Sequence, residues 1–161
     1  METGVSRWLA FAFLAMLGAL PATAQEQPIP YPHDKHIALG LGCLDCHSRA
    51  DTSDRATIPS IRKCLLCHEK VANEGPGVRT LLDFAAKGLE APWRRVYGFD
   101  RLAHVRFRHA PHVRAGVVCQ SCHGDVATMT VASKAVNHTM GTCLTCHREE
   151  HADEDCAACH Y

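Results

Sequence analysis

Ten cysteines and twelve histidines stand out among the 161 residues, and the cysteines follow one strict pattern. Every cysteine belongs to a C-x-x-C pair, and every pair is followed at once by a histidine. The five units are CLDCH (43–47), CLLCH (64–68), CQSCH (119–123), CLTCH (143–147) and CAACH (156–160). On one helical turn the two thiols and the imidazole share a face. Such a unit can bond a flat macrocycle at two points and place a nitrogen ligand against its centre.

Three other kinds of site also use C-x-x-C pairs. Disulfides are common in exported proteins rich in cysteine, but they give the five adjacent histidines no role. Zinc ribbons use two pairs for each metal, and five pairs leave one over. A thioredoxin-like motif appears once, beside a βαβ pattern, and the sequence has no such pattern. Attachment of c-type haem accounts for every cysteine and every adjacent histidine, so the sequence predicts five covalently bound haem c groups.

This interpretation assigns ten thioether cysteines and five proximal iron ligands. The predicted haem-bonding residues are Cys43, Cys46, Cys64, Cys67, Cys119, Cys122, Cys143, Cys146, Cys156 and Cys159. The predicted proximal ligands are His47, His68, His123, His147 and His160.

A second pattern is shared by residues 33–47 (HDKHIALGLGCLDCH) and 109–123 (HAPHVRAGVVCQSCH). Both stretches contain two histidines three residues apart, then a glycine and a C-x-x-C-H unit at the same offsets. Two ligands three apart on a short segment can face two different porphyrins, so each pair can clip two haems together. Seven histidines remain beside the proximal five, and five haems need at most five distal ligands. Every iron can therefore carry histidine on both sides.

Composition and length narrow the possible functions. Lys plus Arg and Asp plus Glu number 17 each, so the polypeptide is formally neutral and gives no electrostatic reason to expect nucleic-acid binding. About 27 residues are available per haem if residues 1–24 are removed. So short a chain cannot wrap five large apolar cofactors in a conventional core. The haems themselves are expected to form the core.

Residues 1–24 have the features of a secretory signal peptide. Arg7 precedes an apolar run (WLAFAFLAMLGAL, 8–20), and Ala22-Thr23-Ala24 forms an A-x-A cleavage site. The run is short for a bilayer span, which needs about 20 residues. We expect cleavage after Ala24 and a periplasmic protein, while an uncleaved membrane anchor is the alternative.

The spacing from His109 to the end of the chain resembles that of the trihaem cytochromes c7, small relatives of the tetrahaem class III cytochrome c3. Residues 33–68 resemble a second copy reduced to two haems. The resemblance implies distal ligation by His33, His36, His109, His112 and His138. It pairs His33 with His47, His36 with His68, His109 with His123, His112 with His147, and His138 with His160. His104 and His151 are left over, and either one, or Met140, can replace an assigned ligand.

The same resemblance implies a mostly irregular fold with short α-helices, little β structure and haems at the centre. We expect a dihaem c7-like half (25–68), a linker (69–106) and a trihaem c7-like unit (107–161). Apolar residues at helical spacing predict a helix over 78–90 in this linker. The stretch 91–107 resembles part of multihaem subunits of bacterial quinol-oxidising membrane complexes of the alternative complex III type. The alternative is a linker that packs Trp93, Tyr97 and Phe99 over haem edges.

Bis-histidine iron has no open coordination position and favours low reduction potentials. The sequence therefore predicts an exported electron carrier rather than an enzyme. Its expected partners are redox proteins, such as a quinol-linked membrane complex or a terminal reductase, and peripheral membrane association is compatible with this. Two alternatives are a fixed electron-transfer subunit of a membrane quinol-oxidising complex and a multihaem reductase with one open haem.

Overall fold

The computed structural model describes residues 26–71 and 74–161, so the predicted signal peptide at 1–24 lies outside the described residues. The described chain forms short helices joined by irregular loops, without a β-strand. The α-helices are α1 (His33–Ala38), α2 (Cys43–Cys46), α3 (Ile61–His68), α4 (Pro76–Ala86), α5 (His109–Arg114), α6 (Cys119–His123), α7 (Met140–Glu149) and α8 (Cys156–Cys159). Two 3-10 turns are η1 (Arg101–Ala103) and η2 (Val126–Thr128). The predicted fold class, short helices with little β structure, is confirmed.

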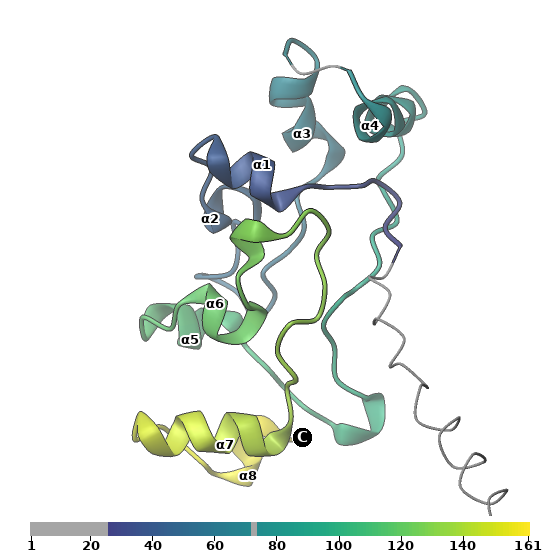
Figure 1. Ribbon diagram of the computed structural model, residues 1–161. Coiled ribbons are helices and arrows are strands. Elements are labelled where there is room, and N and C mark those ends of the chain that lie inside the picture. The colour runs from purple at the N-terminus through teal and green to yellow at the C-terminus, as the bar shows by residue number, and fades with distance from the viewer. Residues whose placement is uncertain (1–25, 72–73) are drawn as a thin grey trace, which may run out of the picture.

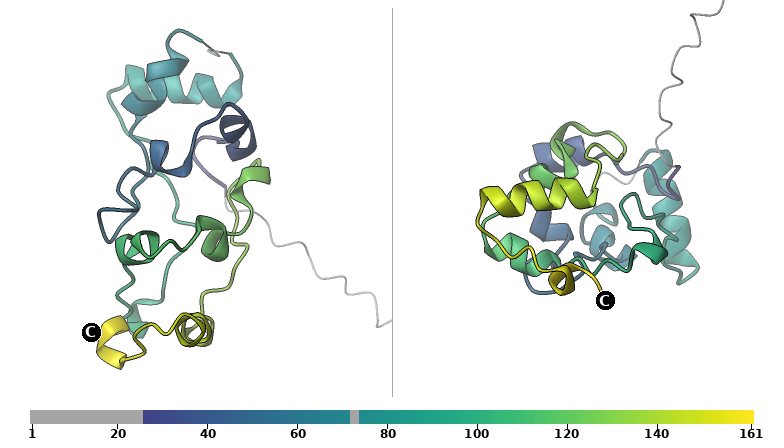
Figure 2. Two further views of the ribbon diagram at one scale, coloured as in Figure 1. Left: turned by 90° about the vertical axis from the view of Figure 1, so that its left-hand side faces the viewer. Right: turned by 90° about the horizontal axis from the view of Figure 1, so that it is seen from below.

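The helices succeed one another along the long axis of the molecule. Figure 1 shows α3 and α4 at one end and α7 and α8 at the other, with α1, α2, α5 and α6 between them. The same succession is visible after a quarter turn about the vertical axis (Figure 2, left). No helix in the described ranges is long and apolar enough to span a bilayer.

The two repeated segments fold in the same way. Both α1 and α5 are followed, two residues after their last residue, by a glycine with positive φ, Gly40 (88°) and Gly116 (85°). The residue after each glycine donates its backbone N–H to the backbone carbonyl oxygen of the second histidine, Leu41 to His36 and Val117 to His112. This left-handed termination favours glycine. The glycine therefore turns the chain sharply, so that each histidine pair and the following C-x-x-C-H unit stay close together.

The linker contains one amphipathic helix. The helix predicted over 78–90 begins at Pro76 and ends at Ala86. Proline at the first helical position costs no hydrogen bond there. The apolar side of α4 packs against α3, where Leu81 joins Ile29, Ile61 and Ala91 in a small buried cluster. Trp93 packs against this cluster, and so does Cys64 of the CLLCH unit.

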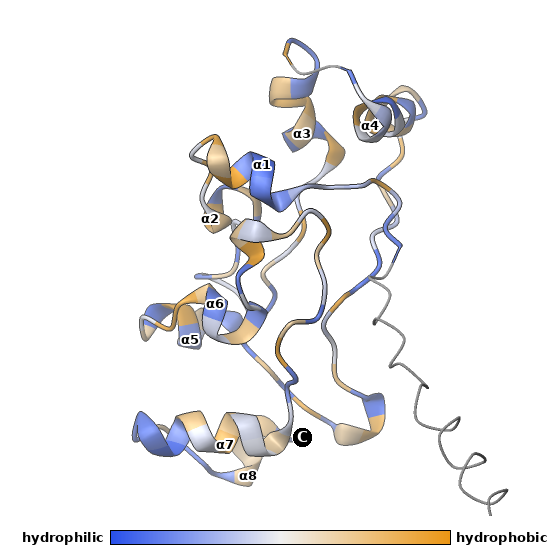
Figure 3. Ribbon diagram, in the orientation of Figure 1, coloured by the Kyte–Doolittle hydropathy of each residue, from blue (hydrophilic) through white to orange (hydrophobic). Residues whose placement is uncertain are grey.

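Apolar burial is sparse in the described chain. Its buried hydrophobic residues are Ile29, Ala50, Ile61, Leu81, Ala91 and Ala110, and no large side chain among them is fully enclosed. Apolar residues are instead distributed along the whole molecule (Figure 3). Several large ones within or next to the C-x-x-C-H units remain exposed, among them Leu44, Leu66 and Val118. These side chains are available to cover apolar groups bound at the motifs.

Candidate haem sites

Each C-x-x-C-H unit occupies about one helical turn. The units lie on α2, on the last turn of α3, and on α6, α7 and α8. None of the ten cysteines, all of which lie in the described ranges, forms a disulfide. We number the motifs in chain order as site 1 (Cys43, Cys46, His47), site 2 (Cys64, Cys67, His68), site 3 (Cys119, Cys122, His123), site 4 (Cys143, Cys146, His147) and site 5 (Cys156, Cys159, His160).

Six of the predicted ligand imidazoles are held by their Nδ1 atoms. Each of these Nδ1 atoms lies within hydrogen-bonding distance of a backbone carbonyl oxygen, which can only accept. The pairs are His36 with Pro32 (2.8 Å), His47 with Thr57 (2.6 Å), His109 with Asp54 (3.0 Å), His112 with Arg108 (2.7 Å), His160 with Ala103 (2.9 Å), and His147 with Asp153. The proton is thereby fixed on Nδ1 and the Nε2 lone pair is left for a metal. Metal-bound histidines are oriented in this way.

Three of the predicted ligand pairs face each other at one characteristic spacing. The ring centroids are 6.1 Å apart for His36 and His68, 6.3 Å for His109 and His123, and 6.0 Å for His112 and His147. Two imidazoles that each bind one metal ion at about 2 Å have centroids roughly 6 to 6.5 Å apart. The spacing therefore suits one iron between each pair, and these residues fit a haem. The ligand assignments themselves stay predictions.

The His33 and His123 rings are half-buried and held in the neutral form. Burial lowers the pKa of His33, and the neighbouring His47 and His36 lower it further. Burial also lowers the pKa of His123, with added effects from His109, His138 and His47. Neutral imidazole is the form that binds a metal ion. His33 thus lies near its predicted partner, His47.

The structure does not bring His138 to its predicted partner, His160. The His138 ring lies 6.3 Å from that of His123, and its Nε2 atom is 2.7 Å from the carbonyl oxygen of Cys122. Ligation at site 5 therefore requires this ring to turn. The backbone of His104 lies next to site 5 in space, because its carbonyl oxygen accepts from Tyr161 N–H and the carbonyl oxygen of Ala103 lies 2.9 Å from His160 Nδ1.

The assignment of His138 predicts a specific spectroscopic result. His138→Ala is expected to convert one iron of the holoprotein, that of site 5, from low-spin to high-spin, because no second imidazole then binds it. Electron paramagnetic resonance of the oxidised protein measures this. The matched variant is His104→Ala, which is expected to keep every iron low-spin. If His104→Ala instead gave the high-spin iron and His138→Ala did not, the ligand would be His104 rather than His138.

The other unassigned candidates lie away from these ring pairs. His151 has a positive φ (52°) in the loop between α7 and α8. Met140 is the first residue of α7 and is 63% exposed. Within the described ranges, no three Cys, His, Asp or Glu side chains converge to hold a bare metal ion.

Comparison with known proteins identifies the C-terminal part of the chain. Residues 105–161 match the family model described as cytochrome c7 and related cytochrome c. This segment is c7-like. It contains sites 3, 4 and 5 and begins two residues before the trihaem unit expected from the sequence. No curated protein matched the chain. The match supports a multihaem c-type cytochrome with covalently bound haem, and cytochromes of this kind transfer electrons.

Both histidine pairs, one within the c7-like segment and one outside it, carry an aromatic clamp. Tyr31 stacks on His36 (4.3 Å) and meets His33 with its edge (4.7 Å). Phe107 lies in the same way against His112 (4.7 Å) and His109 (4.9 Å). Each aromatic residue precedes its first histidine by two positions. The clamp limits rotation of the two rings, and its repetition indicates that the two halves share one local design.

Tyr97 joins the linker to the c7-like segment. Its ring stacks on His138 (4.8 Å) and meets the edge of His123 (4.8 Å). Its hydroxyl oxygen accepts from the N–H groups of Ala135 and Val136, at 2.9 and 3.3 Å. The sequence indicated Tyr97 only as an aromatic cover for haem edges. Its role in holding the loop before α7 depends on backbone groups, which no sequence pattern marks.

Tyr97→Phe is expected to lower the free energy of unfolding of the holoprotein by about 1–2 kcal/mol, because two backbone donors lose their acceptor. Haem content is expected to stay unchanged, since the aromatic ring is retained. Guanidinium unfolding followed by tryptophan fluorescence measures the difference. Tyr161→Phe is the control, because Tyr161 is 72% exposed. Equal effects of the two substitutions would contradict this role for the Tyr97 hydroxyl.

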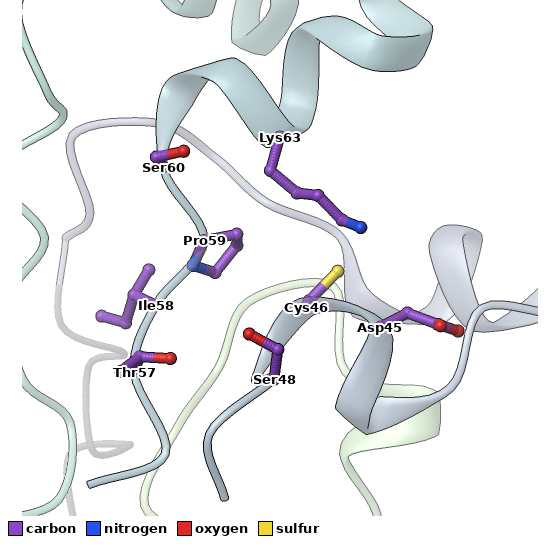
Figure 4. A pocket seen from close by; sticks show the side chains of 8 residues that line it. All are labelled: Asp45, Cys46, Ser48, Thr57, Ile58, Pro59, Ser60 and Lys63. Carbon is purple, nitrogen blue, oxygen red and sulfur yellow. The ribbon is translucent and has the colours of Figure 1, made fainter.

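A shallow pocket of about 280 Å³ separates site 1 from the segment that leads into α3. Its walls include Cys46 on one side and Thr57, Pro59 and Lys63 on the other. Figure 4 shows the Lys63 side chain extending from α3 toward the side where Asp45 and Cys46 lie. An ammonium group in this position can donate to a carboxylate bound beside Cys46. The pocket therefore suits an acidic substituent of a group attached at site 1.

Proposed function

We propose that the chain is an exported pentahaem c-type cytochrome that transfers electrons through closely packed bis-histidine haems. The observation that carries this proposal is the set of facing imidazole pairs at 6.0 to 6.3 Å, in which a backbone carbonyl oxygen fixes Nδ1 of four of the six rings. Haem, when bound, supplies an iron that gains and loses one electron. The family match covers sites 3 to 5, and the repeat extends the same reasoning to sites 1 and 2.

The residues of the chain have three tasks in this function. The ten thiols tether the macrocycles, so that a short chain can hold them without a large core of its own. The proximal and distal histidines would hold each iron from both sides and would thereby exclude water and small substrates. The backbone carbonyls behind the rings keep the imidazoles oriented in both oxidation states, which limits rearrangement. These tasks suit an electron carrier rather than an enzyme.

The partners in this proposal are redox proteins on the outer side of the cytoplasmic membrane. We propose periplasmic electron transfer between a quinol-linked membrane complex and a terminal reductase. A fixed subunit of a quinol-oxidising complex is the alternative. Fractionation of the native host distinguishes them, because a carrier is released with the periplasm and a subunit purifies with the membrane complex. Retention of residues 1–24 in the purified chain would favour the fixed subunit.

The test of the proposed function is a haem count combined with spin-state analysis. The protein, produced with its own signal segment in a host that attaches c-type haem, is expected to carry five haems per chain by pyridine haemochrome titration. Oxidised protein is expected to give low-spin signals alone, and reduced protein is expected to bind no carbon monoxide. One high-spin iron with stoichiometric carbon monoxide binding would favour a reductase, and fewer than five haems would refute the pentahaem assignment.

A further inference from the structure

We infer that the five haem sites form a single row in the order 2, 1, 3, 4, 5. Site 1 then joins the two halves, and sites 2 and 5 lie at the two ends of the row. This inference rests on the proposed function, because it concerns the path between the haems that the chain is proposed to hold. The spatial order differs from the chain order at one place. A simple reading of the sequence would connect the halves through site 2, which immediately precedes the linker.

Sites 2 and 1 are neighbours through α1. The His36 ring faces His68 of site 2 at 6.1 Å, while His33, one helical turn earlier, lies beside His47 of site 1. The Tyr31 ring is stacked on His36, and its phenol lies near the Cys46 thiol of site 1 and the Cys64 thiol of site 2. One helix and one aromatic side chain thus span the two sites.

Sites 1 and 3 are neighbours across the two halves. The Cys43 thiol lies next to the Cys119 thiol. His47 lies close enough to His123 to affect it electrostatically. A thioether sulfur is one carbon away from its porphyrin ring, so adjacent thiols bring the edges of the two macrocycles together. The connection between the halves therefore runs through site 1.

The loop that follows site 1 reinforces this contact. The carbonyl oxygens of Ser53 and Asp54 accept from the N–H groups of Ala110 and His109, at 3.1 and 3.2 Å, and that of Asp51 accepts from Arg114 Nε at 2.8 Å. Three residues of the first half thus hold α5 beside site 1. Site 2 lies on α3, which packs against α4 at the far end of the molecule (Figures 1 and 2).

Sites 3, 4 and 5 continue the row toward the other end. On α5, His109 faces His123 of site 3, and His112 faces His147 of site 4 at 6.0 Å. The Cys122 thiol lies near the thiols of Cys143 and Cys146, and Cys143 lies near Cys159 of site 5. At every step of the row, a thiol of one site therefore lies near a thiol of the next site.

The first test uses the unmodified holoprotein. Fully reduced bis-histidine haems are diamagnetic, so nuclear Overhauser contacts between their thioether substituents report which macrocycles touch. We expect contacts between the haems of sites 1 and 3 and none between those of sites 2 and 3. Contacts between sites 2 and 3 without any between sites 1 and 3 would overturn the order. Haem count and spin state are read on the same sample, so a protein with five low-spin haems and the wrong contacts refutes the order alone.

The second test compares two haem-deleted variants, Cys43→Ala/Cys46→Ala and Cys64→Ala/Cys67→Ala. A ruthenium photosensitiser attached at the C-terminus, with a sacrificial amine as electron donor, reduces the protein from the site 5 end. Without the site 1 haem, the site 2 haem is separated from the other three. Its share of the absorbance change, about a quarter, is expected to appear at least tenfold more slowly than the rest. Without the site 2 haem, all four remaining haems are expected to reduce together. The reverse assignment of the slow phase would overturn the order.

Discussion

The polypeptide produced without haem attachment is expected to be unfolded in water. Only three large side chains, Ile29, Ile61 and Leu81, are buried in the described chain. Burying a side chain of this size contributes about 1.5–3 kcal/mol, while ordering the backbone of each residue costs about 1–2 kcal/mol. The small cluster around α3 and α4 cannot compensate for ordering more than a hundred residues. Covalently held haem must supply most of the apolar contacts.

Amide hydrogen exchange and far-ultraviolet circular dichroism measure this difference. The haem-free chain, with every motif cysteine changed to serine, is expected to show no protected amides, while the holoprotein is expected to show protection in α5, α6 and α7. The holoprotein in the same buffer is the control. A haem-free chain with protected amides in α3 and α4 would show that the apolar cluster is a stable unit in its own right.

The variant His112→Ala is expected to open one iron of five, that of site 4. His112 faces His147 at 6.0 Å and is oriented by the Arg108 carbonyl oxygen. Removing the imidazole leaves this iron with one protein ligand on its axis. The oxidised protein is then expected to show a high-spin signal from one fifth of its iron, and the reduced protein to bind one carbon monoxide per chain. Site 3 is expected to stay low-spin, because His109 is intact.

The matched control is His151→Ala, since His151 is also a histidine of the second half but lies in the loop after α7. It is expected to leave all five irons low-spin. If His112→Ala leaves every iron low-spin, another side chain binds at site 4, and the pairing is wrong. If it opens two irons, the position of α5 as a whole depends on this ring.

The attachment motifs and the histidine clips could be predicted because they are local. A C-x-x-C-H unit needs only one turn of helix, and a pair such as His109 and His112 needs only one more. The glycines at positions 40 and 116 have the same offset in both repeats, but only the structure shows that both follow the end of a helix with positive φ. The short helices and the scarcity of β structure were expected from the resemblance to cytochrome c7.

Other features could not be predicted because they depend on contacts between distant segments. The carbonyl oxygens behind the imidazoles belong to unrelated residue types, such as Thr57 and Asp153, so no pattern marks them. The place of His138 beside Cys122 depends on the loop that Tyr97 holds. The contact between Cys43 and Cys119 joins positions 76 apart in the chain. The resemblance to cytochrome c7 gives no position for the added dihaem half.

The Asp54 carbonyl oxygen accepts from both the backbone N–H and the Nδ1 atom of His109. His109, the predicted distal ligand of site 3, is therefore aligned by a residue that precedes the c7-like segment by about fifty positions. The c7-like segment is then not an independent module here, although its sequence reads as one. In a fragment that begins at residue 105, water would compete for the hydrogen bonds that His109 makes to Asp54. The residues before 105 would therefore serve to position the c7-like segment as much as to bind haems of their own.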